Sequence, residues 1–143
     1  MADVVVRAAE SPADVDAAYA LRHEVFVGEQ QVPVEIERDE LDEAATHVVA
    51  FDGDRCVGAG RLVAADGIGV VGRMAVHAGV RGRGVGQAVL RQLEEAARAA
   101  GLGRIELHAQ AHAVGFYDGQ GYVTYGAPFD EAGIEHVHMR KTL

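Results

Sequence analysis

The chain has 143 residues, 49% of them apolar, and a formal net charge of −9. This size and composition suit one compact domain with its own core, so we expect residues 1–143 to form a single domain. The negative charge opposes binding to nucleic acid or to an anionic membrane. A single cysteine, Cys56, excludes an intramolecular disulfide, and no signal peptide or membrane-spanning run is visible, so we expect a cytoplasmic protein.

The N-terminal segment predicts a strand followed by a helix. The valine-rich run from Val4 to Ala8 is typical of a strand. Ser11 can cap a helix and Pro12 suits its first position, so we expect a helix that extends to about Phe26. Its apolar stripe is imperfect, because Arg22 falls at the edge of the face that would turn inward.

The next segment, residues 31–43, contains one proline and six acidic side chains. We expect a loop or a short second helix there, with the acidic run forming a solvated surface. Two predicted strands, 46–51 and 56–64, flank a turn sequence, Asp52-Gly53-Asp54, that favours a hairpin. A second turn follows, and it leads to an apolar strand at residues 69–76.

The clearest helix runs from Gly84 to Ala100, where apolar residues recur at helical spacing and charged residues occupy the other side. A strand at residues 104–108 and a short helical turn at residues 113–120 follow. Residues 122–125 and 135–140 are predicted to be the last two strands. This order of elements implies an α/β (α+β) fold, a mixed sheet with helices on its faces.

The loop before the long helix is rich in glycine, with the sequence Arg-Gly-Arg-Gly-Val-Gly from Arg81 onward. Glycines allow a ligand to approach the backbone, and free N–H groups at the start of a helix bind phosphate. A P-loop is excluded, because Val85 stands where that motif needs lysine. The dinucleotide fingerprint lacks its third glycine, although Glu106 lies at a suitable distance for a ribose-binding acid, so a dinucleotide stays a weaker alternative.

Two motifs resemble those of the GNAT superfamily of N-acetyltransferases. The first is Arg81-x-x-Gly84-x-Gly86, and the second, downstream, is Gln110-x-x-Ala113-x-x-Phe116-Tyr117-x-x-x-Gly121-Tyr122. Segments around Arg22, Asp39 and His136 are similar to the ElaA-like branch. The resemblance covers nearly the whole chain. It implies a mostly antiparallel twisted sheet of about six or seven strands, flanked by about four helices, with splayed central strands.

The resemblance implies acetyl-CoA as a cosubstrate and indicates which residues would hold it. The strand residues Met74, Ala75 and Val76 would pair through their backbone with the pantetheine arm. The pyrophosphate would be bound by the loop residues Arg81, Gly82, Arg83, Gly84, Val85, Gly86 and Gln87. Gln110 stands where the family usually has asparagine, and its longer amide would reach toward the pantetheine.

The implied chemistry is direct transfer of the acetyl group from the thioester to a primary amine in a ternary complex. A backbone N–H near Met74 can stabilise the negative charge that develops on the carbonyl oxygen. Tyr117 would donate a proton to the departing thiolate, or else its ring simply packs the short helix on the sheet. No covalent enzyme intermediate is required, and we expect Cys56 to be a small buried hydrophobe.

The attacking amine is mostly protonated at neutral pH, so a base or water must take its proton. Glu29, His47, His112 and water are all candidates. The acceptor would be a small molecule or a peptide amine, and the resemblance suggests a homodimer. The alternative to an enzyme is a non-catalytic regulatory module that binds coenzyme A or a nucleotide.

The chain has seven histidines, and their spacing does not indicate a metal site. His108 and His112 lie across the end of a predicted strand rather than on one helix face. His136 and His138 would face one side of a strand, and no cysteine cluster joins either pair. We therefore expect no bound metal.

Overall fold

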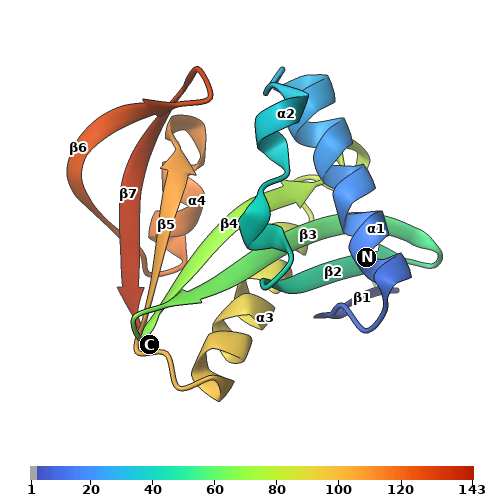
Figure 1. The fold of residues 1–143 in the computed structure, drawn as a ribbon, viewed down its shortest axis with the longest axis horizontal. Coiled ribbons are helices and arrows are strands. Elements are labelled where there is room, and N and C mark those ends of the chain that lie inside the picture. The colour runs from blue at the N-terminus through green and yellow to red at the C-terminus, as the bar shows by residue number, and fades with distance from the viewer. Residues whose placement is uncertain (1–2) are drawn as a thin grey trace.

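The computed structural model describes residues 3–143 as a seven-stranded sheet in the order β1-β2-β3-β4-β5-β7-β6, with helices on both faces (Figure 1). The strands are β1 (Val4–Ala8), β2 (Thr46–Asp52), β3 (Arg55–Ala65), β4 (Ile68–Val76), β5 (Arg104–Gln110), β6 (Val123–Glu131) and β7 (Ile134–Thr142). The α-helices are α1 (Pro12–Arg22), α2 (Val34–Glu37), α3 (Val85–Ala99) and α4 (Val114–Gly119). Shorter helical segments are the π-helix η1 (His23–Glu29) and the 3-10 turns η2 (Glu40–Asp42), η3 (Ala78–Val80) and η4 (Ala111–Ala113).

Neighbouring strands are antiparallel throughout the sheet except for β4 and β5, which are parallel. The predicted mixed and mostly antiparallel sheet with four helices is therefore confirmed. Among residues 3–143, no helix combines the length and the apolar character needed to cross a membrane.

The first helix begins where its capping residues place it. The Ser11 hydroxyl accepts a hydrogen bond of 3.2 Å from the Asp14 N–H, and Pro12 occupies the first helical position. Regular α-helix ends at Arg22, but the chain continues as the π-helix η1 to Glu29. The prediction of one helix to about Phe26 was therefore right about its start and missed the change of helix type.

The sheet has a hydrophobic core on each face. Successive residues of a strand point to opposite sides, and β2 shows this at two adjacent valines. Val48 packs with Val89 and Leu93 of α3, whereas Val49 packs with Leu21 and neighbouring residues of α1 and η1. The two cores fix α3 and α1 on opposite faces of the same central strands.

Two glycines in β3 allow α3 to lie close to the sheet. A side-chain carbon added at Gly58 would come within 2.8 Å of Val85, and one added at Gly60 would come within 2.7 Å of Leu93. Any larger residue would therefore push the helix away. This close approach holds the N-terminus of α3 beside the end of β4.

The last two strands, β6 and β7, are longer than the sequence predicted. The pairing of β6 with β7 is irregular between Tyr125 and Phe129, and Gly126 there has a φ of +72°. This irregularity, together with Pro128, hides the continuation of the strand from a pattern-based prediction. A two-residue turn, Ala132-Gly133, then joins the strands, with both residues at positive φ.

Candidate active site

The central strands β4 and β5 run side by side for only half their length. Residues 68–71 of β4 pair with residues 104–107 of β5, and beyond this point the pairing stops. The two strands diverge from there (Figure 1), and a cleft of about 770 Å³ opens between them. The splayed central strands that the family resemblance implied are therefore confirmed, and they leave residues 72–76 of β4 with one open edge.

A β-bulge reshapes this open edge. Ala59 pairs with Ala75 and Arg61 pairs with Gly72, so β4 has one more residue than β3 in this interval. Arg73, inside the bulge, has a φ of +53°, and its Nε donates a hydrogen bond of 2.9 Å to the Glu37 carbonyl. A bulge of this kind turns backbone N–H groups away from the regular ladder, here at the wall of the cleft.

The predicted pantetheine-binding residues Met74, Ala75 and Val76 all line the cleft, and so does Arg81. The Arg81 Nε donates a hydrogen bond of 3.0 Å to the Val76 carbonyl, and its Nη2 lies 2.9 Å from the Glu29 carboxylate. The Val76 carbonyl already has a protein partner, so a ligand that pairs with it must displace this side chain.

Gln110 also lines the cleft, and its amide is engaged across it. The Gln110 Nε2 donates to the Gln30 Oε1 at 2.7 Å, and the Gln30 Nε2 donates back at 3.2 Å. Gln30 directly follows η1, so this pair connects the helical wall of the cleft with the end of β5. The partner is 80 positions away in sequence, and no local signal predicted it.

The glycine-rich loop forms an open nest of backbone donors. Gly82 and Gly84 have φ values of +79° and +83°, which L-residues with side chains rarely adopt. Within residues 3–143, the main-chain N–H groups of residues 82–87 donate to no protein acceptor. A side-chain carbon added at Gly82 or Gly84 would meet no atom within 4 Å, so the space beside these amides is open. Three of them belong to the first turn of α3, where anions bind.

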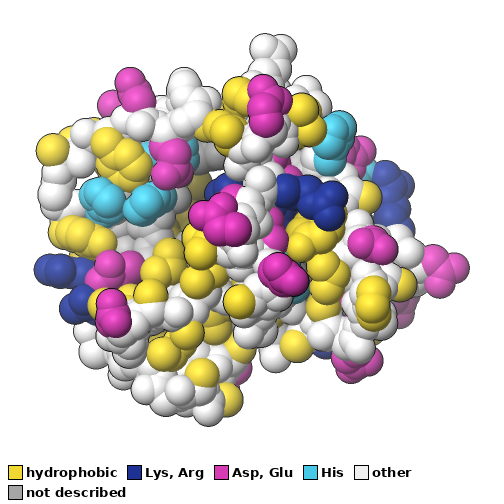
Figure 2. All heavy atoms as spheres, viewed as in Figure 1, with side chains coloured by type: hydrophobic (Ala, Val, Ile, Leu, Met, Phe, Trp, Pro, Cys, Tyr) yellow, Lys and Arg dark blue, Asp and Glu magenta, His cyan; other side chains and the backbone are white. Residues whose placement is uncertain are grey.

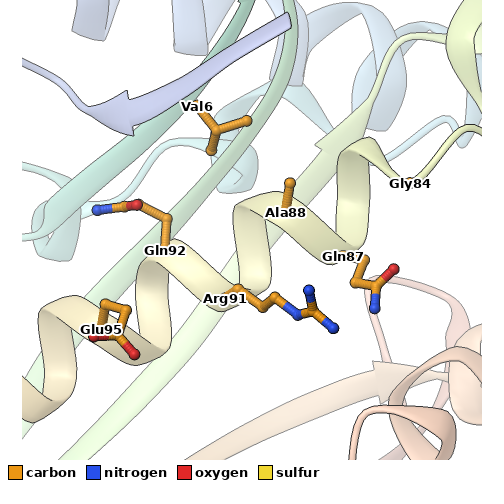
Figure 3. A pocket seen from close by; sticks show the side chains of 7 residues that line it. All are labelled: Val6, Gly84, Gln87, Ala88, Arg91, Gln92 and Glu95. Atoms are coloured by element: carbon orange, nitrogen blue, oxygen red, sulfur yellow. The ribbon is translucent and has the colours of Figure 1, made fainter. Parts of the chain in front are cut away.

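A second pocket, of about 340 Å³, lies along the start of α3 next to this nest. Gln87 and Arg91 are among the residues that line it, and they extend from the same side of the helix (Figure 3). In the described part of the chain, neither Arg83 nor Arg91 has a carboxylate within 4.0 Å, unlike Arg81. Arg91 was not predicted as a site residue, although its spacing of four from Gln87 is the signal that places both on one face.

Tyr117, in α4, lines the cleft and is buried, with 8% of its surface exposed. Burial raises the pKa of its hydroxyl to about 12. Its ring packs edge-to-face against Phe116 and Tyr122, with ring centres 5.0 and 5.8 Å away. The ring therefore has the packing role considered from sequence, while its hydroxyl stays protonated at neutral pH and available as a donor.

The acidic run at residues 35–43 is not a uniformly solvated surface, and this prediction was wrong for Glu37 and Asp42. Both are buried, and Arg22, only 1% exposed, binds them at 2.9 and 2.7 Å. Arg61 binds Asp42 as well, at 2.9 Å. The arginines come from α1 and β3, so their inward direction is set by packing rather than by local sequence. The network holds the segment around α2 against the sheet as a wall of the cleft.

Two of the three side chains proposed as a base do not line the cleft. His47 is buried, and its Nε2 lies 2.8 Å from the Asp42 carbonyl, which indicates a structural role. Glu29 is not part of the lining, although it pairs with Arg81, which is. His112 lies in the lining. Cys56 is half-buried outside the cleft, and burial raises the pKa of its thiol. Residues 3–143 contain no group of three or more His, Cys, Asp or Glu side chains arranged to hold a metal.

The mixed sheet with its splayed central strands is the architecture of an acyltransferase. Residues 6–143 match the family model described as an acetyltransferase (GNAT) domain. The chain therefore belongs to the GNAT acetyltransferase family, as the two sequence motifs predicted.

Similar proteins agree with this assignment. The chain is 44% identical over 125 residues to the uncharacterized N-acetyltransferase YjcF of Bacillus subtilis, covering 87% of this chain and 89% of that protein. It is 31% identical over 132 residues to the protein ElaA of Escherichia coli, covering 89% and 86%. The crystal structure of ElaA superimposes with a TM-score of 0.83 at 27% identity over 96% of this chain and 97% of that one. An acyl-CoA N-acyltransferase from Pseudomonas aeruginosa gives 0.85 at 29% identity over 97% and 98%.

Proposed function

We propose that this protein transfers the acetyl group of acetyl-CoA directly to a primary amine in a ternary complex. One observation carries the proposal: the open edge of β4 at residues 72–76 ends beside the unpaired amides of residues 82–87. The first can pair with an amide-bearing arm, and the second can bind a diphosphate. Coenzyme A carries both groups on one molecule, and Arg83 and Arg91 add positive charge where its phosphates would lie.

The bulge in β4 supports the chemical step. A backbone N–H at Met74, turned out of the ladder, would stabilise the negative charge on the thioester oxygen during attack. The amine nitrogen forms a bond to the carbonyl carbon, the carbon–sulfur bond breaks, and the thiolate leaves. Because both reactants are held in one cleft, no covalent intermediate with the protein is needed.

Tyr117 would supply the proton that the thiolate takes. Its pKa of about 12 lies above that of a thiol, about 8.5, so full transfer from the hydroxyl alone is uphill. The step becomes favourable when the proton that the attacking nitrogen loses is passed to the Tyr117 phenolate oxygen, which restores the hydroxyl. We therefore assign Tyr117 to thiolate departure rather than to coenzyme binding.

The competing function, a regulatory module that binds coenzyme A or a nucleotide without catalysis, makes different predictions. Thermal shift with acetyl-CoA, coenzyme A and NAD tests the ligand, and release of free thiol in a panel of primary amines tests catalysis. We expect stabilisation by the first two ligands only, and thiol release that depends on the amine. Stabilisation without thiol release from any amine would favour the module, and stabilisation by NAD alone would refute the assignment of the nest.

A further inference from the structure

One face of β5, β7 and β6 carries a group of imidazoles next to the cleft, with His108 exposed, His138 half-buried and His136 buried. On β7, His136 is paired across the ladder with Gln110 and His138 with His108. Side chains directly opposite each other in a ladder lie on the same face, so the three histidines share the face of Gln110, which lines the cleft. Figure 2 shows histidine side chains gathered there together with carboxylates.

Glu131, at the end of β6, turns its carboxylate onto this face. One oxygen lies 3.1 Å from the His108 Nδ1 and the other 3.7 Å from the His136 Nε2. The carboxylate therefore reaches across β7 to β5, and all three side chains line the cleft. The turn Ala132-Gly133 fixes the end of β6 from which Glu131 projects.

The hydrogen bond on the far side of His136 decides how its ring meets Glu131. The His136 Nδ1 lies 2.7 Å from the Ile134 carbonyl, which can only accept, so Nδ1 carries a proton. In the neutral ring, Nε2 then presents a lone pair toward a carboxylate that also only accepts. Glu131 and His136 therefore present two acceptors to each other across 3.7 Å, too far apart for a direct hydrogen bond, and an N–H donor placed between them would bond to both.

The other charged groups around this pair leave it without a fixed cation. Arg61 and Arg73 line the same cleft, but both are bound to acidic side chains or carbonyls of residues 37–42. Within residues 3–143, no lysine or arginine lies within 4.0 Å of Glu131. The remaining ionisable groups of the lining are Glu37, Asp39, Arg81, His108, His112 and Tyr117. Glu131 and His136 therefore offer acceptor atoms with no protein cation beside them, and an ammonium group would supply both the positive charge and the N–H donors.

The same cleft also has apolar side chains in its lining. Ile36, Leu41 and Val70 are large exposed hydrophobic residues that line the cleft, and Ile134 lines it beside His136. The ring of Phe129 stacks on His138 with centres 4.4 Å apart, which adds an aromatic surface behind the imidazoles. These surfaces suit an acceptor whose amine is attached to an apolar or aromatic body.

We propose that the Glu131–His136 pair binds the ammonium group of an amine with an apolar body and takes its proton before the amine attacks the thioester. The inference rests on the proposed transfer reaction. One N–H bond of the ammonium breaks, its electron pair stays on the nitrogen as the nucleophile, and the proton passes to the His136 Nε2, which faces the Glu131 carboxylate at 3.7 Å. The second proton that the nitrogen loses goes to the thiolate through Tyr117, and the proton on the pair leaves to solvent after the product departs.

The test compares two amines of similar shape and different basicity, phenethylamine and its β,β-difluoro analogue. The fluorines withdraw electrons, so much more of the analogue is neutral at neutral pH and needs no base. We expect Glu131→Gln to lower kcat/KM for phenethylamine about 100-fold and to lower it by a clearly smaller factor for the analogue. His136→Asn should show the same selectivity, so the result does not depend on one variant. Glu135→Gln, an exposed carboxylate on the same hairpin, is the matched control and should leave both rates unchanged.

Equal losses with the two amines, or no loss in Glu131→Gln, would overturn the role of the pair as a base. A wild-type protein that binds acetyl-CoA in a thermal shift assay but acetylates neither amine would overturn the acceptor class. Failure of the wild-type protein to bind acetyl-CoA would overturn the proposed function itself, and this separate reading distinguishes the two failures.

Discussion

The buried ion-pair network around Asp42 predicts that the substitution Asp42→Asn destabilises the fold. The Asp42 carboxylate accepts hydrogen bonds from the Arg22 Nη1 at 2.7 Å, the Arg22 Nη2 at 3.0 Å and the Arg61 Nη1 at 2.9 Å. It also accepts one from the Asp39 N–H at 3.1 Å. The substitution Asp42→Asn keeps the shape but replaces one acceptor oxygen with a donor that faces guanidinium donors.

The loss of unfolding free energy in Asp42→Asn depends on which ion-pair partners Arg22 and Arg61 keep. Removing one member of a buried ion pair costs about 3–5 kcal/mol, because a charge is left buried without compensation. Arg22 keeps Glu37 and Arg61 keeps Asp39, so we expect the lower end, about 3 kcal/mol. For a chain of 143 residues this corresponds to a fall in the melting temperature of roughly 10 °C, and the protein stays folded at room temperature.

The assay is urea unfolding of the wild type, of Asp42→Asn and of Glu43→Gln, an exposed neighbour that loses the same charge. The pH dependence gives a second measurement. Burial alone would raise the pKa of Asp42, but the hydrogen bonds from Arg22 and Arg61 outweigh it and hold this pKa well below its usual range. In the unfolded chain the value is about 3.9, so the contribution of Asp42 is complete above about pH 5 and is lost as the pH falls further.

The difference in unfolding free energy between the wild type and Asp42→Asn should therefore shrink as the pH is lowered below about 5. A loss of less than about 1 kcal/mol at neutral pH, similar to an exposed ion pair, would refute the reasoning. A difference that stays constant down to about pH 3 would show that Asp42 is not the group whose charge stabilises the fold.

Two further predictions concern the site, and a third concerns the turn between β6 and β7. Tyr117→Phe should lower kcat about 100-fold and leave the Kd for acetyl-CoA nearly unchanged; an unchanged kcat would remove Tyr117 from thiolate departure. Gly84→Asp should weaken acetyl-CoA binding at least about 100-fold, because it places a negative charge where phosphate is expected; normal affinity would place the phosphates elsewhere. Its control is Gly103→Asp, another position with open space around it. Ala132→Asn should stabilise the protein by about 1 kcal/mol in urea unfolding, because asparagine tolerates the left-handed φ of +53° better than alanine; a lower stability would show that the turn is not strained.

The order of helices and strands and the glycine-rich nest follow from the sequence by itself, because each depends on neighbouring residues. Ser11 and Pro12 start α1, helical spacing defines α3, and Gly82 and Gly84 supply positive φ at the nest. These signals are local, so a short window of sequence is enough to predict the family motif and the elements around it. The boundaries of β6 could not be predicted in this way, since its irregular pairing with β7 breaks the alternation that indicates a strand.

Only the tertiary structure decided which charged groups meet. Arg22 interrupts an apolar stripe in the sequence, and its partner Asp42 lies 20 positions later. Glu131 and His108 are 23 positions apart, and their contact depends on the register of three strands. Strand register is set by long-range packing and by turns elsewhere in the chain, so no short window of sequence encodes it. The glycine-rich loop and the strand before it were therefore predictable, whereas the side chains that meet across the cleft were not.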